Sequence, residues 1–301
     1  MTPGTIPVLA VQPETAGTAA AEVAAGTRVQ RAAAWRLGQA WWALHDVWVL
    51  TRRTLARVAS TPEQVINVTV LPVVLVLLFS YVFKGALRLP GHASYTDYVI
   101  VGVFAVNMGA TAQGAAIGLA IDLSTGLIDR FRSLPMARGT VLIGRTVADL
   151  ALTLIAGMVT AGTGLLVGWR VHAPPWHLLL AAGLALLFAW AAAWLGACIG
   201  ILARGADSAQ AVGLMVILPL SLTSSAFISV DRMTPWLRDI VVWNPVSVLA
   251  VACRGLLGDP APAVRAWPIQ HAALASAAWS AVLLALLIPA AVWLYQRRGQ
   301  R

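Results

Sequence analysis

Charged residues divide this chain into long uncharged stretches. Six intervals between consecutive Lys, Arg, Asp or Glu residues hold 20, 24, 20, 33, 23 and 31 uncharged residues. An α-helix needs about 20 apolar residues to cross a bilayer, and a charge at its centre costs about 2.5 to 3.5 kcal/mol. The pattern predicts six transmembrane helices, at about residues 64–83, 98–121, 141–169, 177–203, 209–229 and 271–295.

The segments before the first interval differ from the rest. Residues 1–34 are rich in Ala, Thr, Gly and Pro, which indicates a flexible cytoplasmic tail. In residues 35–60, apolar side chains recur every three or four positions opposite several arginines, and four tryptophans are present. This pattern predicts an amphipathic helix in the membrane interface, with a packed soluble helix as the alternative. Residues 61–301 then form one six-span membrane domain, so the predicted fold class is all-α and polytopic.

Composition agrees with a membrane protein, because apolar residues make up 59% of the chain and charged residues 11%, with a mean hydropathy of +0.78. The net charge of +9 would suit nucleic acid, but the positive residues are scattered over loops and termini without a basic stripe, so no nucleic-acid partner is expected. Placing both termini in the cytoplasm puts 14 of 21 positive residues on that side. We therefore expect a multi-pass membrane protein with both termini in the cytoplasm, and the 20 arginines against one lysine indicate a bacterial plasma (inner) membrane.

Catalytic motifs are missing from the sequence. A phosphate-binding P-loop requires a lysine in a Gly-rich frame, and the chain's single lysine, Lys84, lacks that frame. Gly-x-Ser-x-Gly, His-Glu-x-x-His and Cys-x-x-Cys are also absent, and the two cysteines give no metal-ligand spacing. Proton relays would need Asp, Glu or His inside the spans. We expect no catalytic residue, bound cofactor or metal, and a source of energy outside this chain.

Small and polar residues inside the spans leave two interpretations open. Asn107 and Thr111 share one face of the second span with Gly114 and Gly118, where they either allow close helix packing or line a pathway. In the fifth span the hydroxyls either line a pathway or bond their own helix. The candidate pathway residues are Asn107, Thr111, Met215, Ser221, Ser224 and Ser225.

Other segments carry more local predictions. Gly164-xxx-Gly168 and Gly196-xxx-Gly200 permit close helix approach. Arg145 and Asp149, one turn apart, pair with each other or anchor the third span to headgroups. Residues 230–270 do not span, and 235–242 and 246–257 are expected to form short helices at the outer interface, on either side of Asn244-Pro245.

Two ordered motifs resemble those of ABC-2 type transporter permeases, specifically the daunorubicin-resistance group of drug exporters. The first runs from Gly126 to Arg145 and contains an acidic-Arg pair, Leu-Pro, Arg and Gly-Arg; Asp129 stands where Glu is more usual. The second is Asn244-Pro245-Val246 followed by Arg254-Gly255-Leu256. The resemblance covers about residues 35–296.

The resemblance implies a half-transporter of the type V exporter kind. Two copies would form a homodimer, and two copies of a separate ABC ATPase, which would hold ATP and Mg, would dock beneath it. Residues 35–60 become the connecting helix, and residues 122–138 the coupling element. The implied ATPase-coupling residues are Asp122, Gly126, Asp129, Arg130, Arg132, Pro135 and Arg138; the outer Asn-Pro element comprises Asn244, Pro245 and Arg254.

Force transfer itself requires a short, charged segment between two spans, and residues 122–138 have that character; a solvated positive loop is the alternative. The expected cargo is a hydrophobic or amphipathic drug. Alternatives are a lipid-linked glycan or other envelope component, or no cargo at all in a membrane anchor or assembly protein.

Overall fold

The structure is a computed structural model that describes residues 62–82, 95–125, 138–171, 173–259 and 262–298. The predicted tail and interfacial helix lie outside the described residues, as do Gly126, Asp129, Arg130, Arg132 and Pro135 of the predicted coupling element. Every regular element in the described ranges is helical, as expected for this fold class.

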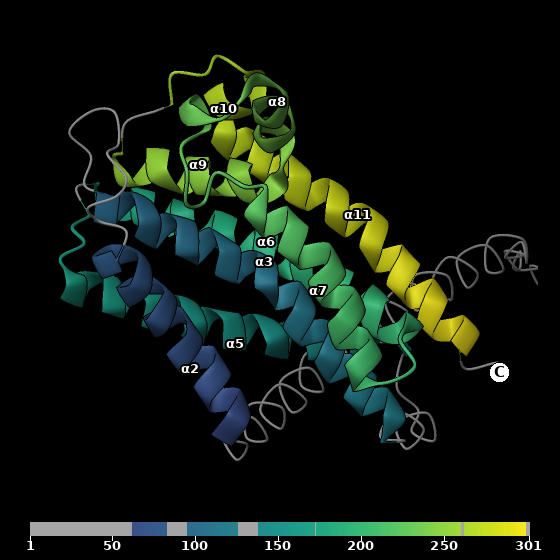
Figure 1. Ribbon diagram of the computed structural model, residues 1–301. Helices are drawn as coiled ribbons and strands as arrows, with labels where there is room; N and C mark the ends of the chain where they lie inside the picture. The colour runs from purple at the N-terminus through teal and green to yellow at the C-terminus, as the bar shows by residue number, and fades with distance from the viewer. Residues whose placement is uncertain (1–61, 83–94, 126–137, 172, 260–261, 299–301) are drawn as a thin grey trace, which may run out of the picture. The chain divides into compact units, whose positions relative to one another are not determined.

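Each uncharged interval of the sequence overlaps one of the longer helices, which are drawn in Figure 1. In chain order, the helical elements are α2 (Pro62–Leu77), which continues as the π-helix η1 (Leu78–Val82), α3 (Tyr95–Ser124), α5 (Arg138–Val167), α6 (Pro175–Leu202), α7 (Ala206–Leu222), the 3-10 turn η2 (Val230–Arg232), α8 (Pro235–Trp243), α9 (Pro245–Leu257), α10 (Trp267–Gln270) and α11 (Ala272–Arg298).

Six membrane spans are not confirmed over the described residues. Four helices, α3, α5, α6 and α11, are long and apolar enough to cross a bilayer, and the α8–α9 pair, bent by 78°, would make a fifth. The first and fifth predicted spans are represented by apolar helices, Thr69–Val82 and Ala206–Leu222, that are shorter than the other four. Helix α7 ends at Leu222, and turns rich in Ser and Thr occupy the rest of the fifth interval.

Helix α3 contacts α2, α5, α6, α7 and α9, and Figure 1 shows it running between α5 and α7. Its contact with α6 depends on the predicted Gly196-xxx-Gly200 pair. A Cβ on Gly196 would clash with the carbonyl oxygen of Ala112, and one on Gly200 would lie 2.6 Å from that of Ala116. The two backbones touch at these positions, which confirms the close approach expected from the spacing.

The other two glycine pairs do not pack as pairs. Gly114 has nothing within 4 Å of an added Cβ, whereas Gly118 lies against the guanidinium of Arg145. Gly164 packs on Ile100, but Gly168 adopts φ 106° just after the end of α5, where a left-handed conformation ends the helix. Gly168 therefore has a turn role, because residues with a Cβ rarely adopt that conformation.

Helices α8 and α9 begin and end close to the predicted bounds, and α9 is packed inside the helix cluster instead of lying on its surface. Nearly all of α9 is buried, with Leu249 and Ala250 fully covered, and it packs against α3, α6 and α11. Alternating Val, Ala and Leu leave it apolar enough to enter the helix cluster. Its single charged residue, Arg254, enters with it and is 5% exposed.

Candidate functional site

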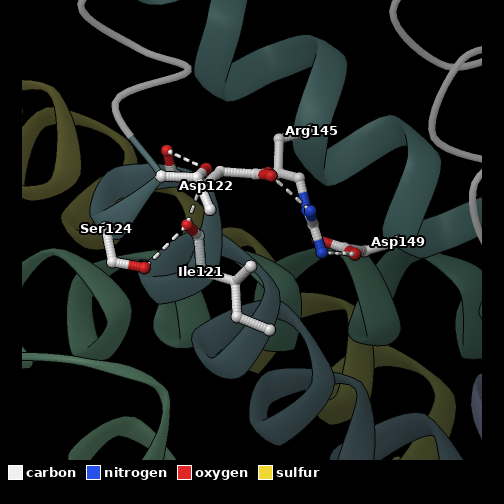
Figure 2. A network of polar contacts seen from close by, with 6 residues as sticks. Ile121, Asp122, Ser124, Arg145 and Asp149 are labelled. Atoms are coloured by element: carbon white, nitrogen blue, oxygen red, sulfur yellow. Dashed lines mark hydrogen bonds and ion pairs between the residues drawn. The ribbon is translucent and has the colours of Figure 1, made fainter.

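A buried charge cluster joins the end of α3 to the first half of α5. Arg145 Nη1 donates to Asp122 Oδ2 at 2.7 Å, and its Nε and Nη2 donate to the two carboxylate oxygens of Asp149 at 3.2 and 3.1 Å. Figure 2 shows the guanidinium held between the two carboxylates. The side chains of Arg145 and Asp122 are 14% and 13% exposed, and that of Asp149 is 5% exposed. Of the two alternatives for Arg145 and Asp149, the structure shows the pairing with each other, and Asp122 is the third member of the cluster.

The cluster brackets the predicted coupling segment. Asp122 lies in the last turn of α3, before residues 126–137, and Arg145 lies two turns into α5, after them. The end of α3 is further closed by Ser124 Oγ, which donates to the Ile121 carbonyl at 2.9 Å (Figure 2). The helices on either side of residues 126–137 are therefore tied to each other by Arg145 and Asp122.

Gly118 makes room for this arrangement. A Cβ at that position would clash with Nη2 of Arg145, so only glycine allows the guanidinium to lie across α3. Asp122 is one turn further along the same face and accepts from the same guanidinium. Gly118 of the second span therefore packs against the Arg145 side chain and not against another backbone.

Hydroxyl and amide groups continue the α3–α5 contact beyond the cluster. Asn107 Nδ2 donates to Thr160 Oγ1 at 3.2 Å, and Thr111 and Thr153 share a hydrogen bond of 2.9 Å between their hydroxyls. Thr153 also donates to the carbonyl of Asp149. Asn107 and Thr111 are therefore engaged with α5 within one copy of the chain, which favours the packing interpretation over a pathway. Such interhelical bonds contribute about 0.6 kcal/mol each in membranes.

The four pathway candidates of the fifth span are not brought together. Met215 is 79% exposed on α7, whereas Ser224 and Ser225 are buried in the turns that follow the helix. Ser224 Oγ donates to the Ser221 carbonyl at 2.5 Å, and the Ser225 amide donates to Ser247 Oγ at 2.9 Å. The Ser224 hydroxyl thus bonds its own helix, as the alternative interpretation expects, whereas Ser225 is bonded to Ser247 of α9.

Asn244 ties α9 to the end of α7. Its Oδ1 accepts from the Val246 amide at 2.9 Å, which caps α9 ahead of Pro245. Its Nδ2 donates to the carbonyls of Leu220 and Thr223 at 2.7 and 3.0 Å. One side chain thus begins one helix and satisfies two carbonyls at the end of another, which explains why an Asn-Pro pair suits this position.

Arg254, near the other end of α9, also binds the segment that follows α7. Its Nη1 donates to the Ser225 carbonyl at 3.0 Å, and its Nη2 donates to the carbonyls of Ala226 and Tyr98 at 2.7 and 3.0 Å. Gly102 of α3 lets the chain at Ala226 approach, because a Cβ there would clash with that carbonyl. Arg254 therefore joins α3, α9 and the segment after α7 through hydrogen bonds to three backbone carbonyls.

Several participating residues were not among the sequence candidates. They are Tyr98, Thr153, Thr160 and Ser247. For two of them a signal was present, because Thr146, Thr153 and Thr160 recur every seven residues and all three are buried. A stripe of that spacing on an apolar helix marks the side that faces a neighbour. Tyr98 and Ser247 meet Arg254 and Ser225 only through the tertiary fold.

Comparison with known proteins gives the family. Residues 45–257 match the ABC-2 type transporter family. The chain belongs to this family. The matched range contains both the Asp122–Arg145–Asp149 cluster and the Asn244 and Arg254 contacts.

Individual relatives of this ABC-2 permease cover most of its length. It is 28% identical over 240 residues, 79% of this chain and 81% of the relative, to the daunorubicin resistance ABC transporter permease protein DrrB1 of Streptomyces coeruleorubidus. It is 27% identical over 222 residues, 70% of this chain and 76% of the relative, to a Mycobacterium tuberculosis protein named "Probable doxorubicin resistance ABC transporter permease protein DrrC". The resemblance seen in the two sequence motifs is confirmed by these matches.

Proposed function

We propose that this ABC-2 permease exports hydrophobic or amphipathic drugs or antibiotics from a bacterial cell, as a homodimer powered by two copies of a separate ABC ATPase. Both termini would lie in the cytoplasm. The similarity to DrrB1, a daunorubicin resistance permease, over 81% of that protein's length carries the proposal. The sequence adds that no P-loop is present to bind ATP.

The geometry supports a route for coupling. An ATPase that pressed on residues 122–138 would act on α3 and α5 together, because Arg145 binds carboxylates on both. Helix α3 would carry the motion to α6 through Gly196 and Gly200, and to α9 through Arg254. The helices that would have to move as one are thus joined by backbone contact or by charge-assisted hydrogen bonds, which are stronger than neutral ones.

The decisive experiment uses the chain with its cognate ABC ATPase, sought first among neighbouring genes. Cells that lack their own efflux pumps and produce both proteins should accumulate less daunorubicin than cells with the permease and an ATPase that cannot hydrolyse ATP. Purified complex in proteoliposomes should hydrolyse ATP faster when daunorubicin is added.

Other outcomes separate the alternatives. A complex that hydrolyses ATP but responds to no hydrophobic compound would remove the drug proposal, and stimulation by a lipid-linked glycan would favour an envelope exporter with the same fold. A chain that assembles with no ATPase would favour a membrane anchor or assembly protein.

A further inference from the structure

A groove lies between α5 and α6, at the end of these helices away from the charge cluster. Its volume is about 290 Å³, close to the lower end of ligand pockets, and its surface is apolar. Phe104 and Met108 of α3 form the floor, with Cys253 of α9 beside them. The groove is therefore built from four helices that the contacts described above tie together.

Small side chains hollow out this groove. Gly157 and Ala161 are one turn apart on α5, and Ala181 and Ala182 face them from α6. Larger residues at these positions would fill the space between two neighbouring helices, as they do in a close-packed interior. The rims carry exposed apolar side chains, with Leu154 44%, Met158 58% and Leu178 44% exposed. In a membrane such faces meet lipid, so the groove opens to the hydrocarbon and not to water.

The polar groups in the lining are already in use. Thr153 donates to the Asp149 carbonyl and is bonded to Thr111, and Thr160 donates to the Ala156 carbonyl and accepts from Asn107. A polar ligand would have to leave its own groups unpaired there, at a cost of about 1 to 3 kcal/mol each. An uncharged apolar group carries no such cost. Two methionines and two aromatic rings, Phe104 and Trp169, give adaptable and flat surfaces suited to a ring system.

We infer that this α5–α6 groove binds the uncharged, ring-bearing part of the exported compound, which enters from the lipid phase. The inference rests on the proposed function and adds the site to it. The groove also stands where the ATPase could act on it, because α5 carries the groove wall at Gly157 and Ala161 and the charge cluster at Arg145 and Asp149. A displacement of α5 against α6 would widen or narrow the groove.

The test fills the groove in the complete complex with its ATPase in proteoliposomes. Ala161→Phe and Ala182→Phe place a ring inside it. Gly162→Phe and Gly183→Phe are matched controls, because each neighbours a groove residue and has open space at its Cβ. The groove variants should raise the daunorubicin concentration for half-maximal ATPase stimulation by about tenfold or more, equivalent to about 1.4 kcal/mol, while the controls should match the wild type.

A gentler variant covers the case in which phenylalanine prevents folding. In a Cys198→Ala, Cys253→Ala background, Ala182→Cys should react with a lipid-soluble maleimide and be protected by daunorubicin, whereas Gly183→Cys should react without protection. The groove site would be overturned if daunorubicin stimulated the wild type and the groove variants equally and did not protect Ala182→Cys. The proposal of drug export would still stand in that case. If Ala182→Cys reacts in detergent but not in drug-free phosphatidylcholine vesicles, the groove holds membrane lipid and the inference is overturned. A wild-type complex that neither exports nor responds to any drug would instead remove the proposed function.

Discussion

The guanidinium carbon of Arg254 lies 3.4 Å from the centroid of the Tyr98 ring, while Nε and Nη2 of the same group donate to the Tyr98 carbonyl at 3.3 and 3.0 Å. Tyr98 OH in turn donates to the Ser225 carbonyl at 2.8 Å, which Arg254 Nη1 also binds. Arg254 thus stacks on the Tyr98 ring, and both side chains donate to the Ser225 carbonyl. This arrangement lets a cation enter the helix cluster, because its charge is met by backbone dipoles and an aromatic face.

Arg254→Lys should destabilise the protein strongly although the charge is kept. A lysine ammonium cannot reach three carbonyls in different directions and cannot stack on Tyr98 as a planar group. Loss of two or more hydrogen bonds to a charged group, at about 1.5 to 3 kcal/mol each, should lower the thermal unfolding temperature of the detergent-solubilised protein clearly. Arg265→Lys is the control, since Arg265 is exposed. Equal unfolding temperatures for the two variants would contradict this role of Arg254.

Substitutions of Asn244 should separate its two tasks. Asn244→Asp keeps the oxygen that caps α9 but replaces the Nδ2 donor with a carboxylate facing the carbonyls of Leu220 and Thr223. Asn244→Ala loses the cap, worth about 1 kcal/mol, and leaves those carbonyls without a donor. Because repulsion adds to the lost bonds, Asn244→Asp should be at least as destabilising as Asn244→Ala when thermal unfolding is compared. A stable Asp variant would show that the cap is the main contribution.

Much of the helical framework could be predicted from the sequence, because charges are costly in hydrocarbon and their positions mark where helices end. The bounds of α8 and α9 followed from Asn244-Pro245 for a similar local reason. The burial of α9 could not be predicted, since it depends on how Arg254 finds carbonyls of Tyr98, Ser225 and Ala226, far apart along the chain.

In the candidate site, too, contacts within one helix could be predicted from the sequence and contacts between helices could not. An Arg145–Asp149 pair follows from helical spacing, but the third member, Asp122, joins only when α3 and α5 are side by side. Asn107 and Thr111 could be placed on one helix face from their spacing, yet spacing alone did not distinguish a partner helix from a pathway. That choice required the positions of Thr153 and Thr160.

Gly196→Leu should disrupt the α3–α6 contact. The new side chain meets the backbone at Ala112 and not the flexible end of a side chain, so the helices must separate. Overpacking of this kind costs about 1 to 3 kcal/mol, measurable as a lower unfolding temperature. Gly183→Leu on the same helix is the control, because open space surrounds its Cβ. Similar losses in both variants would point to helix propensity as the cause and not to the contact.

Arg145→Leu should be more harmful than the double change Arg145→Leu, Asp149→Leu. The single variant leaves Asp149 buried without its cation, and breaking a buried pair costs about 3 to 5 kcal/mol. The double variant removes the buried carboxylate as well, and Asp122 is the less buried of the two carboxylates. Yield of folded protein and thermal unfolding should therefore recover in the double variant. No recovery would mean that Arg145 has a contribution beyond the charge balance.

Gly118→Ala separates coupling from stability, with Gly114→Ala as its match on the same helix. Alanine in a helix interior is favoured over glycine by about 1 kcal/mol, but at position 118 its Cβ clashes with Arg145 Nη2, the far end of a flexible side chain. Arg145 must shift to make room, which lengthens its hydrogen bonds to Asp122 or Asp149 without removing the guanidinium from between them. The unfolding temperature should therefore rise for Gly114→Ala and change little for Gly118→Ala, where the shift of Arg145 offsets the gain in helix propensity, while the amount of drug exported per ATP hydrolysed should fall for Gly118→Ala alone. An unchanged ratio in Gly118→Ala would argue that force reaches α3 and α5 separately, and the cluster would then serve only to hold the two helices together.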